Sequence, residues 1–185
     1  GSDDRKVIKD FNTFPYSAIT ILDFLHDGFY TGTGIAVSPT HVLTAAHNPY
    51  DTKADKETKK LRIKTSTNAP PVSNFLDGLE NLTKVNYLAD FDKTEAPGDD
   101  IALLKTSESL VAAKEAIGII AFVNPETAKG VTIQMAGYAY DNVDNKIPGN
   151  SGVGFEGREL VLSPKDEPGK IIGTSGKRFY YSQEV

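Results

Sequence analysis

Short runs of apolar and β-branched residues, separated by turn-forming residues, make up most of the first part of the chain. These runs predict strands at residues 17–22, 29–37 and 41–44, with turn signals at 26–28 and 38–40 between them. The second turn contains a proline, which fixes its own φ angle and favours a reversal of the chain. Strands joined by such short turns predict an antiparallel meander.

Further strand patterns follow in the rest of the chain. The predicted strands lie at residues 81–87, 100–105, 130–136, 170–174 and 178–181. The strand at 130–136 is expected to end at Gly137 and Tyr138, and the last two strands are expected to form a hairpin around 175–177. Many short strands with little helix predict a sandwich or a barrel.

Three segments depart from the strand pattern. A helix is predicted at 107–117, because a serine can cap it, the run Ala-Ala-Lys-Glu-Ala favours it and Gly118 can end it. Residues 50–75 are polar, and within them 53–60 predict a solvated loop or a short helix. Residues 141–157 are rich in turn-forming and polar residues, which predicts an irregular connection.

Composition places the chain among soluble globular proteins. Its 185 residues suffice for one large domain or for two small barrels that share a cleft. The apolar fraction of 39% and the charged fraction of 24% are ordinary. No apolar run approaches the ~20 residues that span a bilayer, so we expect no membrane association. The net charge of −5, without a basic cluster interleaved with aromatics, argues against nucleic acid as a partner.

The absence of cysteine narrows the chemistry further. It excludes a disulfide framework, a thiol nucleophile and a thiolate metal site. It fits exported bacterial proteins that fold without disulfides, although cytosolic proteins can lack cysteine too. The Gly1-Ser2 start resembles the remainder of a cleaved tag, so the lack of a leader peptide says nothing about where the native protein resides.

One segment points to catalysis. Residues 32–47 read Gly-Thr-Gly-Ile-Ala-Val-Ser-Pro-Thr-His-Val-Leu-Thr-Ala-Ala-His, in which small Ala45 and Ala46 allow a tight turn behind the final imidazole. His47 is therefore expected at a strand end facing a cleft, where an imidazole can accept and return a proton near neutral pH. A carboxylate commonly orients such an imidazole, and Asp100, which opens Asp-Ile-Ala-Leu-Leu, is the candidate because this run resembles the acid's motif in a known protease family.

The other candidates in the same regions receive plainer interpretations. His26 lies in a turn and His41 starts a strand, and we expect both to face solvent. Asp99 adjoins Asp100 but lacks the register of the motif, so it is expected to be a solvent-exposed neighbour.

Thr-Ala-Ala-His followed by Asp-Ile-Ala-Leu resembles the chymotrypsin/trypsin-like serine protease family, in particular its bacterial exported branch of glutamyl endopeptidases and exfoliative toxins. The resemblance implies an all-β fold of two antiparallel β-barrels of the trypsin-like type. It implies an N-terminal segment at 1–16, a first barrel with the interbarrel connection at 17–118 and a second barrel at 119–185. It also implies His47 as catalytic base, Asp100 as its acid, and no metal or organic cofactor.

The nucleophile has more than one candidate. Gly149-Asn150-Ser151-Gly152 matches the family's Gly-x-Ser-Gly, but only residues 139–148 separate it from Gly137-Tyr138, and it continues Val-Gly where the family has a small residue and proline. Pro-Gly-Asn-Ser-Gly is also an ordinary turn sequence. Residues 169–185 instead resemble the hairpin that precedes the nucleophile. We favour this second interpretation, in which the serine lies beyond Val185 and the second barrel is incomplete here. A third interpretation matches 169–185 to the strands that follow the nucleophile, and Ser151 is then the nucleophile.

These observations predict a secreted, monomeric serine endopeptidase that cuts peptide or protein substrates through a Ser-His-Asp triad. The resemblance also implies that a freed N-terminus can take part in substrate recognition. The alternative is a catalytically inactive relative that serves as a binding or toxin-like recognition module. An unrelated β-barrel protein is the third class, and separation of His47 from Asp100 in the fold would favour it.

Overall fold

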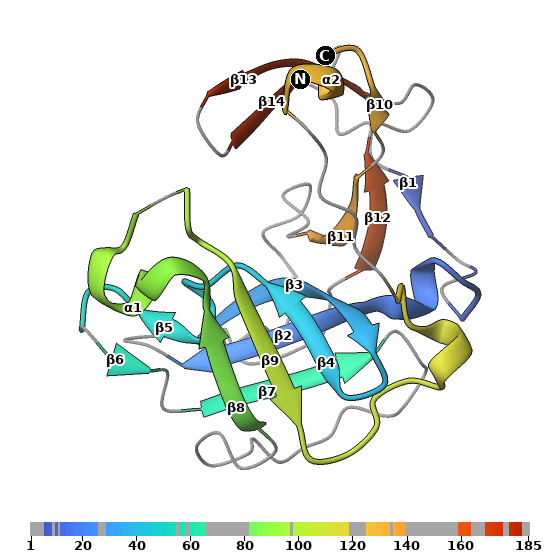
Figure 1. The fold of residues 1–185 in the computed structure, drawn as a ribbon. Helices are drawn as coiled ribbons and strands as arrows, with labels where there is room; N and C mark the ends of the chain where they lie inside the picture. Colours follow the sequence, from blue (N-terminus) through green and yellow to red (C-terminus); the bar gives the residue numbers. More distant parts are fainter. Residues whose placement is uncertain are drawn as a thin grey trace, which may run out of the picture.

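Antiparallel β-sheet makes up most of the regular structure in the described part of the chain (Figure 1). The computed structural model describes residues 6–8, 10, 12–25, 29–54, 56–57, 60–65, 82–96, 98–118, 125–133, 135–139, 159–163, 169–175 and 178–182. Every strand pair in this part of the chain is antiparallel. The predicted all-β class with antiparallel sheets is therefore confirmed.

A six-stranded sheet, here called the first sheet, carries the larger core. Its strands, in spatial order, are β7 (Lys60–Thr65), β2 (Ile19–Leu25), β3 (Phe29–Ser38), β4 (His41–Thr44), β9 (Ala102–Thr106) and β8 (Leu82–Tyr87). The predicted meander is confirmed, since β2, β3 and β4 pair in succession. The reversal after β3 falls at Pro39 and Thr40 as expected, while the predicted turn at 26–28 lies outside the described residues.

Alternating side chains explain why this sheet forms. Leu22, Phe24, Val42 and Leu104 point to one face and are buried together in a core cluster. Full burial of one such side chain stabilises the fold by about 1.5–3 kcal/mol. Gly34 lies so close to this cluster that a Cβ would be 2.6 Å from the Val42 side chain. The glycine therefore permits the close packing of β3 against its neighbours.

Strand β7 was missed by the sequence analysis. The segment 53–60 forms neither a helix nor one continuous loop in its described part: a turn at 52–54 is followed by the short strand β6 (Lys56–Glu57), and β7 starts at Lys60. The sequence of β7 alternates cations with Leu61 and Ile63, and Ile63 packs against the core cluster. Its polar composition concealed a pattern with a period of two residues.

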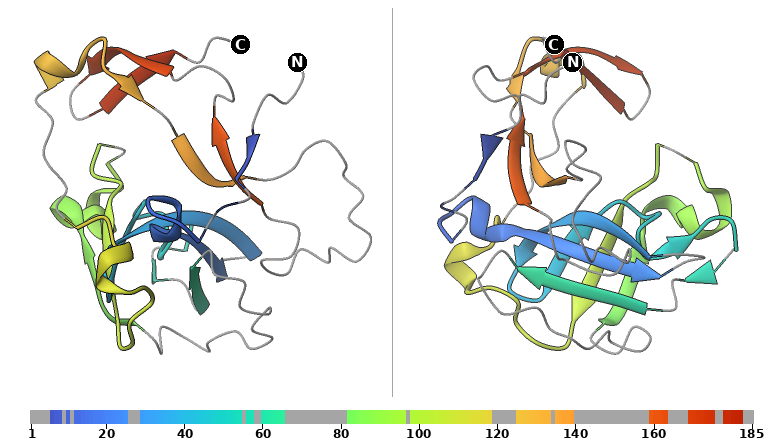
Figure 2. Two further views of the ribbon diagram at one scale, coloured as in Figure 1. Left: turned by 90° about the vertical axis from the view of Figure 1, so that its right-hand side faces the viewer. Right: turned by 180° about the vertical axis from the view of Figure 1, so that it is seen from behind.

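Two three-stranded sheets and one two-stranded sheet lie outside the first sheet in the described part of the chain (Figure 2). The second sheet has the order β1 (Lys6–Val7), β12 (Glu159–Ser163) and β11 (Met135–Ala139). The third sheet has the order β10 (Thr132–Ile133), β13 (Gly169–Ser175) and β14 (Arg178–Ser182). The hairpin of β13 and β14 confirms the prediction for the end of the chain. The strand predicted at 130–136 is wrong as one strand, because β10 and β11 join different sheets.

The predicted helix at 107–117 is also wrong. This segment contains only the short 3₁₀ helix η3 (Ala113–Glu115). Instead of bonding within a helix, the Leu110 N–H donates to the Pro39 carbonyl at 2.8 Å, and the Ile117 N–H donates to the Ala36 carbonyl at 2.9 Å. These bonds hold the segment along the β3–β4 hairpin, and buried Val111 anchors it. Tertiary contacts thus override a local helix propensity that is worth only tenths of a kcal/mol per residue.

Short elements complete the fold. They are η1 (Tyr16–Ala18), β5 (Tyr50–Asp51), η2 (Leu88–Asp90), α1 (Phe91–Thr94) and α2 (Pro125–Ala128). None of the helices in the described ranges has the length and apolar character that crossing a membrane requires.

The first and second sheets meet through β11. Ile8 and Ile19 form a small buried cluster, against which Tyr16, Ala136 and Tyr138 pack. The Tyr138 N–H of β11 also donates a hydrogen bond to the Thr33 hydroxyl of β3, at 2.9 Å. The domain boundaries at residues 16 and 118 stay a prediction.

Candidate active site

His47 and Asp100 lie in direct contact. The imidazole Nδ1 of His47 is 2.7 Å from Oδ2 of Asp100, and the backbone N–H of His47 donates to Oδ1 of the same carboxylate at 2.9 Å. The imidazole is 56% exposed, whereas the carboxylate is 27% exposed. Both carboxylate oxygens are thus used to hold one residue, and the rest of the imidazole ring remains accessible.

A tight turn after β4 presents His47. The Asn48 N–H donates to the Ala45 carbonyl at 3.2 Å, and the Tyr50 N–H donates to the Ala46 carbonyl at 3.1 Å. Ala46 is completely buried behind the turn. A larger side chain at this position would displace the turn, so the small residue has the role that the sequence predicts for it.

Asp100 lies on the loop that returns from β8, and Ile101 separates it from β9. The Leu88 N–H donates to the Ile101 carbonyl at 2.9 Å, which extends the β8–β9 pairing up to the loop. Phe91 of this loop is buried in a cluster with Ala46, Tyr50 and Ala102. The same cluster therefore supports the turn that carries His47 and the strand that follows Asp100.

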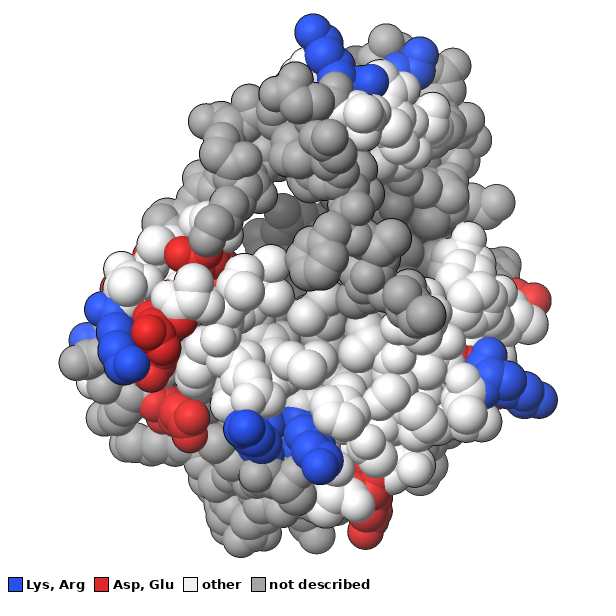
Figure 3. Space-filling view, viewed as in Figure 1, with Lys and Arg blue, Asp and Glu red and all other residues white. Residues whose placement is uncertain are grey.

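The outer side of this loop is charged. Charged side chains gather on the side of the molecule where α1 lies (Figure 3), and Lys93 forms an exposed ion pair with Asp90 at 3.3 Å. Tyr87 lies between this surface and the buried cluster. Its ring contacts Tyr50 edge to face, with centroids 5.7 Å apart, and its hydroxyl donates to Glu57 at 3.5 Å. Burial and the carboxylates of Glu57 and Asp92 raise the pKa of the Tyr87 hydroxyl.

Because folding raises the pKa of Tyr87, this residue should cause part of the protein's loss of stability at alkaline pH. Tyr87→Phe should remove that part. In the unfolded chain a tyrosine loses its proton near pH 10, while folded Tyr87 keeps its proton to higher pH. The stability contributed by Tyr87 is therefore complete below about pH 10 and is lost as the pH rises toward the folded pKa. Urea unfolding at about pH 8 and about pH 11 should show a smaller loss of stability for Tyr87→Phe than for the parent. Equal losses would contradict the assignment.

A polar network that the sequence analysis missed supports the turn that carries His47. The buried side-chain amide of Asn48 donates to the Thr44 hydroxyl at 2.8 Å, and this hydroxyl donates to the Thr33 carbonyl at 2.9 Å. Gly32 packs against Asn48 so closely that a Cβ would be 2.6 Å from its amide nitrogen. The available signal was the presence of polar residues within an otherwise apolar hairpin.

A hollow of about 400 Å³ adjoins the imidazole. Its lining includes the rings of Phe24 and Tyr30, which stack with centroids 5.9 Å apart. Its other lining residues are Thr31, His47, Asn48, Tyr50, Asp51, Thr52 and Lys53. The imidazole thus borders a space with both aromatic and polar walls. Among the described residues, this site included, no group of three or more His, Asp or Glu side chains offers ligands for a metal ion.

Two neighbouring candidates differ from expectation. His41 starts β4 as predicted, but it is half-buried, and its Nδ1 lies 2.8 Å from the Ser38 hydroxyl and 3.2 Å from the Thr40 hydroxyl. These bonds close the turn between β3 and β4, so the solvent-facing interpretation is wrong. Asp99 is half-buried rather than exposed. His26 and Ser151, with its motif, lie outside the described residues.

Comparison with known proteins identifies the fold. No protein-family model and no curated protein matches this sequence. Among solved structures, the chain is similar to a Glu endopeptidase in complex with MPD, with a TM-score of 0.66 and 19% identity over 95% of this chain and 71% of that one. It is also similar to GrC, granzyme C, with a TM-score of 0.55 and 16% identity over 91% of this chain and 64% of that one.

These similar structures are trypsin-like serine proteases, so the chain has a trypsin-like fold. At such low identities the likeness establishes the fold and not the activity. The chain spans about two thirds of the length of these structures.

Proposed function

We propose that this chain carries the base and the acid of a trypsin-like serine endopeptidase, which hydrolyses peptide bonds through a Ser-His-Asp triad. The observation that carries the proposal is the contact of 2.7 Å between His47 Nδ1 and Asp100 Oδ2, made in a trypsin-like fold. On this proposal, the six-stranded sheet contributes to the first of two barrels, and the site lies between them.

The two bonds to Asp100 explain how the imidazole would act. A carboxylate can only accept hydrogen bonds, so the ring nitrogen that faces it carries a proton. The other ring nitrogen, Nε2, is then unprotonated and can accept the proton of a serine hydroxyl. The second bond, from the His47 N–H to Oδ1, fixes the carboxylate relative to the backbone. Asp100 also stabilises the positive charge that the ring gains when Nε2 is protonated.

The proposed reaction is acyl transfer followed by hydrolysis. The serine oxygen attacks the peptide carbonyl carbon while Nε2 of His47 takes the hydroxyl proton. Collapse of the tetrahedral intermediate breaks the C–N bond, and Nε2 delivers that proton to the leaving amine. Water then attacks the acyl-enzyme with His47 as base again, which releases the carboxylic acid and regenerates the serine.

Two positions are proposed for the nucleophile. It is Ser151, or it is a serine beyond Val185, which we favour because residues 169–185 resemble the hairpin that precedes the nucleophile in this family.

The proposal includes a protein or peptide substrate, secretion, and membership of the bacterial exported branch. The lack of cysteine fits exported bacterial proteins that fold without disulfides. Detection of the full-length protein in culture medium tests the export.

Covalent labelling tests the proposed activity. A fluorophosphonate reacts only with an activated serine, so it should label the full-length protein at a single serine. Mass spectrometry of the labelled peptide then distinguishes Ser151 from a serine beyond Val185. His47→Ala should abolish labelling because it removes the base.

His41→Ala is the matched control, because it removes an imidazole that bonds to Ser38 and Thr40 and not to Asp100. It should retain labelling. Absence of labelling in the folded full-length parent would overturn the protease proposal in favour of the inactive, protease-like recognition module. Labelling that survives His47→Ala would remove His47 from the mechanism.

A further inference from the structure

Thr33 connects two parts of the fold with its side chain and its backbone. It lies in the middle of β3, and its hydroxyl accepts the N–H of Tyr138 from β11 at 2.9 Å. Strand β11 is at the edge of the second sheet, so the side of β11 that faces away from β12 is open to such a contact. The hydroxyl of Thr33 thus bonds the first sheet to the second.

The backbone of the same residue leads to the catalytic turn. The carbonyl of Thr33 accepts the Thr44 hydroxyl at 2.9 Å, and Thr44 in turn accepts the amide of Asn48 at 2.8 Å. Asn48 directly follows His47. A chain of three hydrogen bonds therefore runs from β11, through Thr33 and Thr44, to the residue beside the imidazole.

Glycines make this connection tight at both ends. A Cβ on Gly137 would lie 3.2 Å from the Thr33 hydroxyl, and a Cβ on Gly32 would lie 2.6 Å from the Asn48 amide nitrogen. Both are close approaches that a larger residue would disturb. Close packing thus accompanies the hydrogen bonds at both ends of the path from β11 to Asn48.

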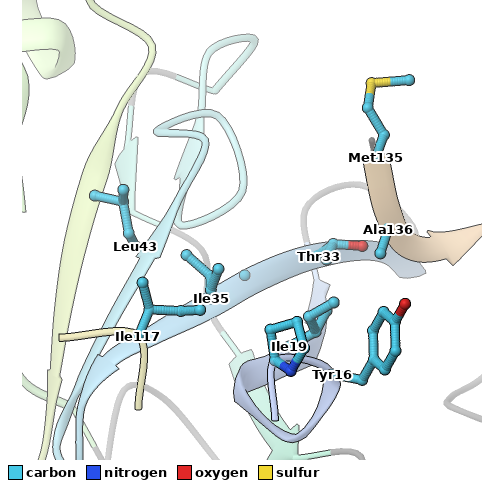
Figure 4. A pocket seen from close by; sticks show the side chains of 10 residues that line it. Tyr16, Ile19, Thr33, Ile35, Leu43, Ile117, Met135 and Ala136 are labelled. Atoms are coloured by element: carbon cyan, nitrogen blue, oxygen red, sulfur yellow. The ribbon is translucent and has the colours of Figure 1, made fainter. Parts of the chain in front are cut away.

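The Thr33 hydroxyl lies at the edge of a groove whose lining is mainly apolar. It points toward β11 beside Ala136, at one end of a groove of about 610 Å³ between the two sheets (Figure 4). The other side chains that line this groove are mainly apolar: Pro15, Tyr16, Ile19, Ile35, Leu43, Ile117 and Met135. Hydrogen bonds in apolar surroundings are electrostatically stronger than those in water. The bond is therefore suited to fix β11 at one distance from β3.

We propose that Thr33 is a positioning residue of the proposed protease, which sets the distance between the imidazole of His47 and the nucleophile. The inference rests on the proposed function. Both candidate nucleophiles follow β11 in the chain, whereas His47 lies on the turn that follows β4 of the first sheet. The imidazole must come within about 3 Å of the serine hydroxyl, and a displacement of about 1 Å can cost about 100-fold in rate. A direct bond between the two sheets is one way to hold that distance.

Two substitutions at Thr33 separate the hydroxyl from the rest of the side chain. Thr33→Val keeps the shape and removes the acceptor, while Thr33→Ser keeps the acceptor and removes a methyl group. In the full-length protein, Thr33→Val should lower kcat by about tenfold to 100-fold with KM changed less than about threefold. Thr33→Ser should restore kcat to within about threefold of the parent.

Thr106→Val is the matched control for a purely structural effect. Thr106 is a buried threonine of the same sheet, and its hydroxyl donates to the Thr40 and Glu108 carbonyls at 3.2 and 2.7 Å. Its loss should lower the melting temperature and leave kcat unchanged. A Thr33→Val variant with the kcat of the parent, or equal losses in Thr33→Val and Thr33→Ser, would overturn the proposal.

Hydrogen exchange provides a readout that needs no activity. The Tyr138 amide should exchange faster in Thr33→Val than in the parent or in Thr33→Ser, because its acceptor is gone. Unchanged exchange would contradict the bond itself. A parent that lacks peptidase activity and fluorophosphonate labelling would instead contradict the proposed function, and with it the positioning role, before any substitution is compared.

Discussion

Replacing Asp100 by Asn is expected to lower kcat about 10⁴-fold in the full-length protein, with little change in KM. The reason lies in the two bonds that Asp100 accepts, from the ring and from the backbone N–H of His47. The backbone group can only donate, so it takes the single oxygen of the Asn amide. The amide nitrogen then faces Nδ1 and donates to it, which moves the ring proton to Nε2. A ring protonated at Nε2 cannot accept the serine proton.

Kinetics and ¹⁵N spectroscopy together check this prediction. The imidazole ¹⁵N shifts of His47 should report a proton on Nδ1 in the parent and on Nε2 in Asp100→Asn, a readout that does not depend on turnover. Asp99→Asn is the matched control, because it makes the same chemical change one residue away and should alter kcat less than about threefold. A decrease of only a few-fold in Asp100→Asn would show that Asp100 does not orient the base.

Replacing Leu104 by Ala is expected to lower the free energy of unfolding by about 3–5 kcal/mol. Leu104 is completely buried in the core cluster with Leu22, Phe24 and Val42. Its removal costs the transfer free energy of the lost carbons and leaves a cavity that close-packed neighbours fill only in part. Because domains are stable by about 5–15 kcal/mol, this one substitution would remove a large share of the total.

Urea unfolding of the parent, Leu104→Ala and Leu103→Ala checks this expectation. Leu103 is the neighbour on β9, half-buried on the opposite face of the sheet, where it pairs with Leu43. The same atoms are removed in both variants, so the difference isolates the burial of position 104. Leu103→Ala should cost less than half as much. Equal losses would mean that the core does not lie on the Leu104 face.

Much of the first sheet could be predicted from the sequence because its signals are local. The hairpin of β3 and β4 follows from apolar runs on either side of Ser38-Pro39-Thr40, and the strand at 82–87 follows from its alternation. His47 and Asp100 could be selected as partners from their motifs, and the structure brings the two side chains together. The strands and turns follow from signals between neighbouring residues, whereas the pairing of His47 with Asp100 came from the resemblance of their motifs to the serine protease family.

Other elements depend on contacts that no local window contains. The segment 107–117 favours a helix by itself, but bonds from Leu110 and Ile117 to the β3–β4 hairpin hold it in another conformation. The run at 130–136 divides into β10 and β11 because its two parts find different partner strands. The polar strand β7 forms because β2 offers it an edge, which its own composition does not reveal.

The sequence by itself determined which chemical groups are present and most of the turns and strands that carry them. Only the tertiary structure decided which distant groups meet: that both carboxylate oxygens of Asp100 hold His47, and that Thr33 bonds to β11. The physical reason is range. Strand and turn propensities act between neighbours in the chain, whereas a hydrogen bond of about 2.9 Å between distant residues exists only after the sheets have packed.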